Sequence, residues 1–333
     1  MIISRTPFRM SFFGGGTDYP AWYEENTGAV ISTTIDKYCY VTCRYLPPFF
    51  EYNYRIVYSQ REAVKHLSDI KHPSVRECLI FMNLDKGVEI HHDGDLPART
   101  GLGSSSAFTV GLLNVLYALK GEMVSKKKLA LDAIYIEQQK IRECVGSQDQ
   151  TIAAFGGFNK IIFSKNNNIE VHPMTLTPEK LQYFQKHLML FFTGFSRTAS
   201  EIAREQVKET PNKKKELKVI YEMVDEAVNI LNNNEDGFGD FGKLLNEHWR
   251  LKRNLTSKIS TPAVDEIYEA ALRAGAMGGK LLGAGGGGFI LFFVKPELQP
   301  KVKEALKKLL YVPFRFDTLG SQIIYYGPDQ QIE

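Results

Sequence analysis

The chain has 333 residues, of which 44% are apolar, enough for a large core in one long or two ordinary domains. The net charge is only +3 and charges of both signs are spread along the chain, so nothing indicates binding to nucleic acid or to a membrane. The four cysteines match no zinc-binding spacing, no signal peptide opens the chain, and no apolar run approaches the ~20 residues of a membrane helix. These features predict a cytoplasmic protein with reduced thiols.

The first unusual segment is a run of three glycines. Residues 2–4, 9–13, 29–34 and 38–45 are rich in β-branched and aromatic residues, and we expect them to be strands. Between the second and third of these lie residues 14–18, here called the triple-glycine loop. Its glycines permit backbone conformations that other residues avoid, and they leave room for a ligand. Asp18 at the end of this loop either caps the short helix that follows or contacts that ligand.

A second glycine-rich segment, residues 95–107, joins a predicted strand to a predicted helix that starts at Ser104. We call it the glycine-serine loop. Its glycines expose backbone N–H groups, and the helix start adds unpaired N–H donors and partial positive charge, a combination that suits a phosphate. Its serine hydroxyls can cap the helix, contact a phosphate or reach a magnesium ion. The pattern is not a P-loop, which requires Gly-x-x-x-x-Gly-Lys followed by Ser or Thr. It is also a poor dinucleotide fingerprint, because Ser106 stands where the last glycine of that fingerprint would be.

The order of Pro97 and the Gly-Leu-Gly-Ser-Ser-Ser-Ala run resembles the second motif of the GHMP kinases. These are small-molecule kinases that act on galactose, homoserine, mevalonate and related substrates. The resemblance implies that the loop wraps the phosphates of ATP. The ATP-binding residues that it implies are Pro97, Gly101, Leu102, Gly103, Ser104, Ser105 and Ser106.

The segment from Arg9 to Tyr19 has the spacing of the galactokinase signature, Arg-Val-Asn-Leu-Ile-Gly-Glu-His-Thr-Asp-Tyr. The resemblance implies that Arg9 acts at the reacting centre and that the triple-glycine loop binds the sugar, through Asp18, Gly15, Gly16 and Thr17. Two glycines replace the Glu and His of galactokinases, so galactose itself is a doubtful substrate. The segment is most similar to the D-glycero-D-manno-heptose 7-phosphate kinases, sugar-1-kinases of bacterial surface-polysaccharide synthesis.

Two carboxylates in the middle of the chain also have the family spacing. Glu137 lies on a helix predicted over residues 126–144, and Asp149 lies twelve positions later, in the first turn of another helix. By themselves they are ordinary helix carboxylates. The resemblance implies that Glu137 and Ser105 hold Mg²⁺ and that Asp149 approaches the acceptor hydroxyl. Asp149 then either takes the proton of that hydroxyl or only orients it.

The second half contains a further candidate anion site and a glycine-rich segment. Ser196 and Arg197, before a predicted helix, either bind a sugar phosphate or form an ordinary loop and cap. Residues 278–288 satisfy Gly-x-Gly-x-x-Gly, but a strand is predicted directly after them, where a dinucleotide site requires a helix. The segment resembles the third GHMP motif instead, which in the family packs against the nucleotide loop. It implies substrate contacts from Gly285 and Gly286.

The remaining predictions for the second half concern its regular elements. Strands are expected over residues 158–163, 169–174, 187–192, 289–294 and 321–326. Helices are expected from residue 200 and over residues 213–232, 238–253, 261–274 and 296–309.

Three motifs and the acid pair, in family order, predict an α+β protein with the two-lobed GHMP-kinase fold. The N-terminal lobe, with a topology similar to domain 2 of ribosomal protein S5, is expected over residues 1–175 and should hold the ATP loop. A ferredoxin-like α/β sandwich is expected over residues 176–333.

The implied reaction is ATP- and Mg²⁺-dependent phosphorylation of D-glycero-D-manno-heptose 7-phosphate at its anomeric hydroxyl. The 1,7-bisphosphate would feed nucleotide-activated heptose into surface-polysaccharide synthesis. The alternatives are another sugar-1-kinase, of the fucose or galactose type, and a kinase-like sugar sensor without turnover. The expected partner is a small sugar phosphate, and a homodimer is compatible with these features.

Overall fold

The computed structural model describes residues 1–84, 86–98, 100–194, 199–233 and 238–327. Within these residues the chain forms a large mixed sheet and a smaller antiparallel sheet. The strands of the large sheet are β1 (Ile2–Phe13), β2 (Gly28–Tyr45), β3 (Tyr54–Val57), β4 (Arg61–Val64), β5 (Val88–Gly94), β6 (Phe158–Ser164), β7 (Asn168–Pro173), β12 (Phe316–Asp317) and β13 (Gln322–Tyr326). Their order is β13-β1-β2-β5-β3-β4. Strands β12 and β6 also pair with β2, and β7 pairs with β6 in a hairpin.

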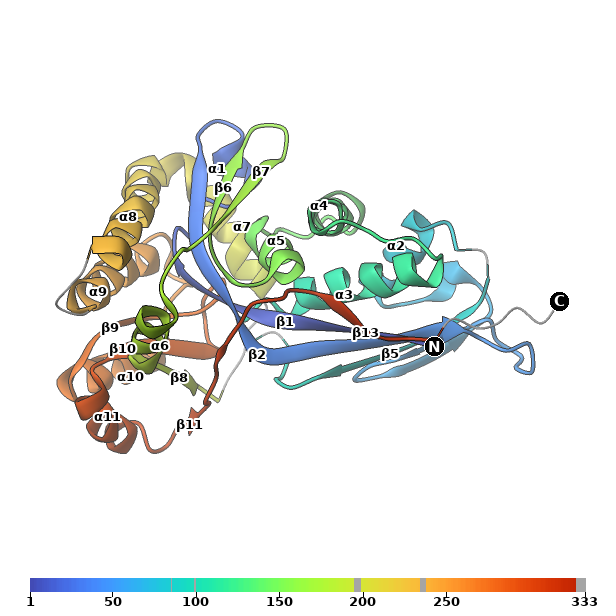
Figure 1. The fold of residues 1–333 in the computed structure, drawn as a ribbon. Coiled ribbons are helices and arrows are strands. Elements are labelled where there is room, and N and C mark those ends of the chain that lie inside the picture. Colours follow the sequence, from blue (N-terminus) through green and yellow to red (C-terminus); the bar gives the residue numbers. More distant parts are fainter. Residues whose placement is uncertain (85, 99, 195–198, 234–237, 328–333) are drawn as a thin grey trace.

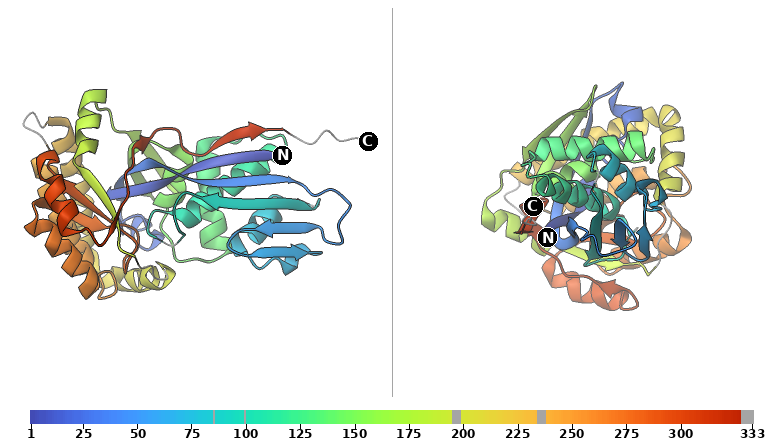
Figure 2. Two further views of the ribbon diagram at one scale, coloured as in Figure 1. Left: turned by 90° about the horizontal axis from the view of Figure 1, so that it is seen from below. Right: turned by 90° about the vertical axis from the view of Figure 1, so that its right-hand side faces the viewer.

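The smaller sheet has the order β11-β8-β10-β9. Its strands are β8 (Leu188–Phe192), β9 (Ala276–Leu281), β10 (Phe289–Val294) and β11 (Leu310–Tyr311). The molecule is elongated, with this sheet at one end and the N-terminus at the other (Figures 1 and 2). Strand β10 is buried along its whole length, as expected for the central strand of a covered sheet.

Helices cover both sheets. They are α1 (Pro20–Tyr23), α2 (Pro73–Phe81), α3 (Ser104–Leu119), α4 (Lys126–Tyr135), α5 (Gln148–Phe155), α6 (Pro178–Lys186), α7 (Ala199–Glu209), α8 (Lys214–Asn233), α9 (Gly239–Arg253), α10 (Pro262–Arg273) and α11 (Gln299–Ala305). Helix α3 packs against β1 and β2, and Figure 1 shows it beside α2 and α4 along the large sheet. Helices α9 and α10 pack on β9.

The two longest strands differ from the sequence prediction, which divided each of them in two. The pairing of β1 with β2 shifts register between Pro7 and Phe8, because Asp36 and Lys37 of β2 have no opposite residue. Such a bulge bends a strand without ending it, and in the sequence it looks like a break between strands. The continuous β1 carries Arg9 and ends directly before the triple-glycine loop.

The helix predicted over residues 126–144 is also different. Helix α4 ends at Tyr135 and is followed by one turn of π-helix, Ile136–Lys140, which contains Glu137. Single π-helical turns inside or at the end of α-helices are frequent at functional sites. The helix predicted over residues 296–309 is shorter as well, because a 3₁₀ turn precedes α11 and α11 ends at Ala305.

The other predicted elements agree with the structure to within a few residues, and the α+β class is confirmed. The starts of α3 at Ser104 and of α10 at Pro262 are as expected, and Thr261 caps α10 by accepting the N–H of Val264. Strands β12 and β13, near the end of the chain, return to the large sheet. The division of the chain near residue 175 stays a prediction.

The structure agrees with two further sequence observations. All four cysteines are free thiols, and three of them are buried. Across the described ranges, no helix combines the length and apolar character that crossing a membrane requires.

Candidate active site

Arg9 is the centre of the predicted site. Its Nε and Nη2 donate hydrogen bonds to the two carboxylate oxygens of Asp149, each 2.8 Å long, and its Nη1 donates to the carbonyl oxygen of Gly101 at 2.6 Å. The backbone N–H of Arg9 donates to the carbonyl of Leu102 at 3.0 Å. Bidentate pairing of guanidinium and carboxylate is strong and fixes geometry. Arg9 therefore joins β1, the glycine-serine loop and the start of α5 in one constellation.

The glycine-serine loop is shaped by its glycines, and its serines do not cap the helix. Gly103 is the N-cap of α3, in a left-handed conformation (φ 73°), and no side chain caps this helix end. A Cβ on Gly101 would lie 2.3 Å from the carbonyl oxygen of Leu282, so this position requires glycine. Uncapped N–H groups at a helix start bind anions well. These features are compatible with a phosphate site, and the ATP contacts of this loop stay a prediction.

The third glycine-rich motif packs on the glycine-serine loop, as the resemblance implied. The N–H of Phe289 donates to the carbonyl of Thr100 at 3.0 Å. The substrate contacts predicted for Gly285 and Gly286 stay predictions, but the structure shows what these two glycines contact within the protein. Gly286 donates its N–H to the carbonyl of Ile259 at 2.9 Å, and a Cβ on Gly285 would lie 2.7 Å from Ile259. Both glycines therefore face the chain around Ile259, where glycine permits close packing.

Glu137 is buried, and one of its oxygens is unpaired. Its Oε2 accepts hydrogen bonds from Ser106 Oγ at 2.8 Å and from the side-chain amide of Gln150. Its Oε1 is buried and forms no hydrogen bond of good geometry among the described residues, although the hydroxyl of Thr109 lies near enough to the carboxylate to favour its charged form. Burial raises the pKa of Glu137 to about 7, against hydrogen bonds that favour the charged form. The alternative of an ordinary, solvated helix carboxylate is therefore excluded for Glu137.

These residues fit a hard divalent cation. A buried carboxylate oxygen without a partner, next to a hydroxyl and a phosphate-type loop, matches the oxygen ligands that Mg²⁺ takes. Ser106 is the serine at Glu137, whereas Ser105 is exposed. Successive helix residues point about 100° apart, so only one of the two serines can face Glu137. Ser105 therefore does not make the hydrogen bond to Glu137, and its predicted place at the cation stays a prediction.

Asp18 is the last residue of the triple-glycine loop. It is 2% exposed, and its Oδ1 accepts the N–H of Gly16 at 2.9 Å. Burial raises the pKa of this carboxyl, and the negative charge of Asp149 nearby adds to the shift. A Cβ on Gly146 would lie 1.9 Å from Asp18 Oδ2, so the chain before α5 has room for Asp18 only because this residue is glycine. Asp18 and Asp149 therefore share one site.

Thr17 closes the triple-glycine loop. Its hydroxyl donates toward the carbonyls of Gly14 and Ala29, and it accepts the N–H of Ala29 at 3.0 Å. The side chain is fully buried. Its single hydroxyl hydrogen is used within the protein, so Thr17 shapes the loop, and the substrate contact predicted for it stays a prediction. Ser196 and Arg197, the other predicted substrate contacts, lie outside the described residues.

Sequence reasoning missed two polar side chains that reach this loop. Lys252 Nζ donates to the carbonyl of Gly15 and to Gln206 Oε1, both at 3.0 Å. A signal for Lys252 was present, because it follows His248 and Trp249 at helical spacing on the buried face of α9. A lysine on such a face needs a polar partner, which the sequence alone does not identify.

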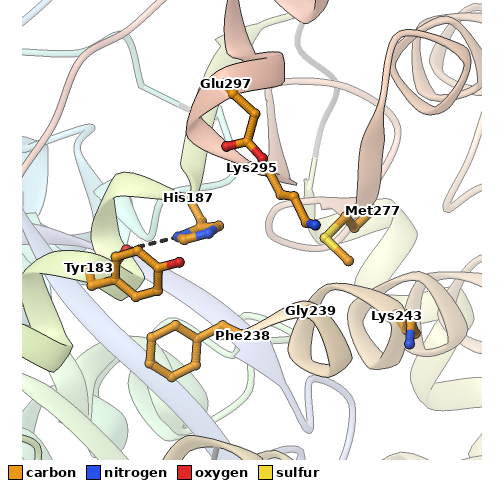
Figure 3. A pocket seen from close by; sticks show the side chains of 8 residues that line it. All are labelled: Tyr183, His187, Phe238, Gly239, Lys243, Met277, Lys295 and Glu297. Carbon is orange, nitrogen blue, oxygen red and sulfur yellow. Dashed lines mark hydrogen bonds between the residues drawn. The ribbon is translucent and has the colours of Figure 1, made fainter. Parts of the chain in front are cut away.

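A cavity of about 430 Å³ lies apart from these residues (Figure 3). It is lined by Tyr183, His187, Phe238, Gly239, Lys243, Met277, Lys295 and Glu297. The imidazole Nδ1 of His187 pairs with the carbonyl of Tyr183 at 2.9 Å, and the imidazole ring stacks on the ring of Phe293. These contacts give His187 a structural role in the fold. None of the predicted site residues that the structure describes lines this cavity.

Two family models match the chain in the order in which the motifs occur. The GHMP kinases N terminal domain matches residues 61–157, and the GHMP kinases C terminal model matches residues 232–312. Together they cover more than half of the chain. The chain belongs to the GHMP kinases. It is therefore a phosphotransferase, and members of this family use ATP as the phosphoryl donor.

Individual GHMP kinases resemble the chain over most of its length. The D-glycero-alpha-D-manno-heptose 7-phosphate kinase of Campylobacter jejuni is 28% identical over 317 residues, which are 92% of this chain and 93% of that protein. The mevalonate kinase of Thermococcus onnurineus is 29% identical over 227 residues, but the match spans 66% of this chain and 63% of that enzyme.

Solved structures of GHMP kinases share the fold. A D-glycero-D-manno-heptose 1-phosphate kinase from Bacteroides thetaiotaomicron superimposes with a TM-score of 0.73 at 24% identity, covering 98% of this chain and 99% of that one. Lactococcus lactis galactokinase, in complex with galactose, gives a TM-score of 0.74 at 17% identity, covering 96% and 94%. At these identities the likeness shows the fold alone.

The two serines make a direct test of the cation site in this GHMP kinase. We expect Ser106→Ala to raise the Mg²⁺ concentration needed for half-maximal turnover at least about tenfold, because Glu137 loses its hydroxyl neighbour. Ser105→Ala, one residue away and exposed, should change this concentration less than about threefold. Titration of MgCl₂ at saturating ATP measures both. A larger effect of Ser105→Ala would support the place at the cation that the sequence predicted for Ser105.

Proposed function

We propose that this GHMP kinase transfers the γ-phosphoryl group of ATP to the anomeric hydroxyl of D-glycero-D-manno-heptose 7-phosphate, giving the 1,7-bisphosphate. The proposed substrate rests on the similarity to the C. jejuni heptose 7-phosphate kinase, which extends over 92% of this chain and 93% of that protein. The composition of the triple-glycine loop supports it, because Gly15 and Gly16 leave no side chains of the galactokinase type at the acceptor.

The chain's own groups have distinct roles in this reaction. The N–H groups at the start of α3 and in the glycine-serine loop bind the phosphates of ATP. Asp18 accepts hydrogen bonds from the hydroxyls of the acceptor. Arg9 holds Asp149 by two hydrogen bonds and contributes positive charge beside the loop, where negative charge develops during transfer.

Asp149 orients the attacking hydroxyl and accepts its proton late. Its side chain is 24% exposed, and both oxygens are already held by Arg9. Each oxygen keeps a lone pair, so the carboxylate can still accept one more hydrogen bond. In a loose phosphoryl-transfer transition state the attacking oxygen has formed little bond to phosphorus, so early removal of its proton is not required.

Glu137 and Ser106 are the residues that would hold Mg²⁺. The unpaired Oε1 and the hydroxyl supply hard oxygen ligands beside the loop. When bound, the ion neutralises charge on the β- and γ-phosphates. With a pKa of about 7, Glu137 must lose its proton before it can bind a cation, so cation binding favours the charged carboxylate.

A panel of acceptors tests the substrate. Release of ADP should be measured with heptose 7-phosphate, heptose 1-phosphate, unphosphorylated heptose, fucose, galactose and mannose. We expect kcat/KM for heptose 7-phosphate to exceed that for every other acceptor at least about 100-fold, because a site built for a charged group rejects analogues that lack it. Preference for fucose would favour the second candidate, which rests on 24% identity to an Arabidopsis thaliana bifunctional fucokinase over 91% of this chain. Nucleotide binding without turnover on any acceptor would favour the sensor.

A further inference from the structure

Three side chains from the second half of the chain hold the triple-glycine loop and the end of β1. Lys252 on α9 donates to the carbonyl of Gly15 and to Gln206 of α7. Lys280 on β9 donates to the carbonyl of Phe12 at 2.9 Å. Both lysines are buried, with exposed fractions of 5% and 4%. The loop that contains Asp18 is therefore tied to elements that lie more than 180 residues later in the chain.

The same side chains fill the space beside the loop. Gly16 has a φ of +112°, and a Cβ built there would lie 2.7 Å from Gln206 Nε2 and 3.5 Å from Lys252 Nζ. The pair of Gln206 and Lys252 thus stands where a side chain at position 16 would be. Position 16 therefore has to be glycine as long as Gln206 and Lys252 occupy this space.

Burial of the two ammonium groups is costly, which argues for a role beyond packing. Within the described ranges, the hydrogen bonds of Lys252 and Lys280 go to two backbone carbonyls and one side-chain amide oxygen, and to no carboxylate. Burial lowers the pKa of Lys252 to about 8, and the charge of Asp18 opposes this shift. A buried ammonium without a salt-bridge partner is normally replaced by an apolar residue unless it serves a purpose. Here Lys252 donates to the loop carbonyl of Gly15, and Lys280 donates to the carbonyl of Phe12 near the end of β1.

We infer that Lys252, Gln206 and Lys280 are positioning residues that hold the triple-glycine loop, and thereby fix Asp18 for binding of the acceptor. We call these three residues the loop clamp. The inference depends on one part of the proposed function, which is that Asp18 binds a hydroxylated acceptor. It assigns no contact between the loop clamp and ATP, since its bonds go to Phe12, Gly15 and one another.

The test compares Lys252→Met with Lys243→Met. Both lysines lie on α9, but Lys243 is exposed and pairs with Asp240 one turn away. We expect Lys252→Met to raise the KM for the acceptor at least about tenfold and to change the KM for ATP less than about twofold, because a hydrogen bond from a charged group to the loop is lost. Lys243→Met should leave both constants unchanged. Equal increases in both constants, or no increase in a folded Lys252→Met protein, would overturn the inference.

A second variant and a second readout cover the other outcomes. Gln206→Ala keeps Lys252 but removes the side-chain oxygen that accepts its hydrogen bond, and it opens the space beside Gly16. If Lys252→Met does not fold, Gln206→Ala tests the loop clamp in its place. Hydrogen–deuterium exchange of residues 10–23 in the ligand-free enzyme should be faster in either variant than in Lys243→Met. Exchange does not depend on the acceptor, so absence of turnover on heptose 7-phosphate would reject the proposed substrate alone. Unchanged exchange in both variants would reject the loop clamp.

Discussion

Replacement of Asp149 by Asn should lower kcat about 10³-fold while the dissociation constant for ATP changes less than about threefold. The asparagine lacks the second anionic oxygen, so it can no longer accept both hydrogen bonds of Arg9, and its NH₂ group faces a guanidinium that also only donates. It can neither take the proton of the acceptor nor hold Arg9 in place. The ATP site should remain, because the glycine-serine loop has its own support from Thr100 and Phe289.

The control for this variant is Asp225→Asn, an exposed carboxylate that pairs with Lys160 away from the site. It should retain wild-type kcat. Steady-state kinetics and nucleotide titration by calorimetry measure the two expected effects. The double variant Arg9→Met/Asp149→Asn should be little worse than the worse single variant, because the two residues act as a unit. Turnover close to wild type in Asp149→Asn would remove Asp149 from the mechanism.

Replacement of Glu137 by Gln should lower kcat about 100-fold at a physiological Mg²⁺ concentration. The amide keeps the shape of the side chain but loses the charge and the unpaired carboxylate oxygen that we assign to the cation. Increasing the Mg²⁺ concentration should restore only part of the activity. Glu226→Gln, an exposed carboxylate on α8, is the matched control and should titrate like the wild type. Wild-type Mg²⁺ dependence in Glu137→Gln would place the cation elsewhere.

The same variant should change how stability depends on pH in the absence of metal. Because burial raises the pKa of Glu137 from 4.5 to about 7, the folded protein binds more protons than the unfolded chain between these values. The contribution of this group to stability is therefore fully present below pH 4.5 and is lost as the pH rises through 7. Urea unfolding in EDTA at pH 5 and pH 8 should show a smaller loss of stability in Glu137→Gln than in the wild type. An equal loss in both proteins would contradict the burial of the charge.

The sequence predicted the contacts that depend on motif order and local geometry. Arg9 lies within β1, whereas the glycine-serine loop and Asp149 lie at the starts of α3 and α5, and these regular elements fix the directions in which the three meet. The helix start at Ser104 and the strand after the last glycine run were readable for the same reason.

The parts that were missed depend on tertiary structure or on single-residue irregularities. The bonds of Lys252 and Gln206 to the triple-glycine loop join segments far apart in the chain, and no local pattern encodes them. The π-helical turn at Glu137 changes the direction of its side chain, and periodicity cannot reveal one extra residue in a turn. The hydrogen bond from Ser106 to Glu137 depends on that direction, so only the structure shows it.

The central claim is that this GHMP kinase phosphorylates the anomeric oxygen of a sugar that already carries a phosphate. Phosphorus NMR of the product formed from ATP, Mg²⁺ and D-glycero-D-manno-heptose 7-phosphate tests it most directly. We expect a second ester resonance that couples to the anomeric proton, with the original 7-phosphate resonance retained, and no such product with Asp149→Asn. A new ester on any other oxygen, or no new ester while a different sugar is phosphorylated, would contradict the account.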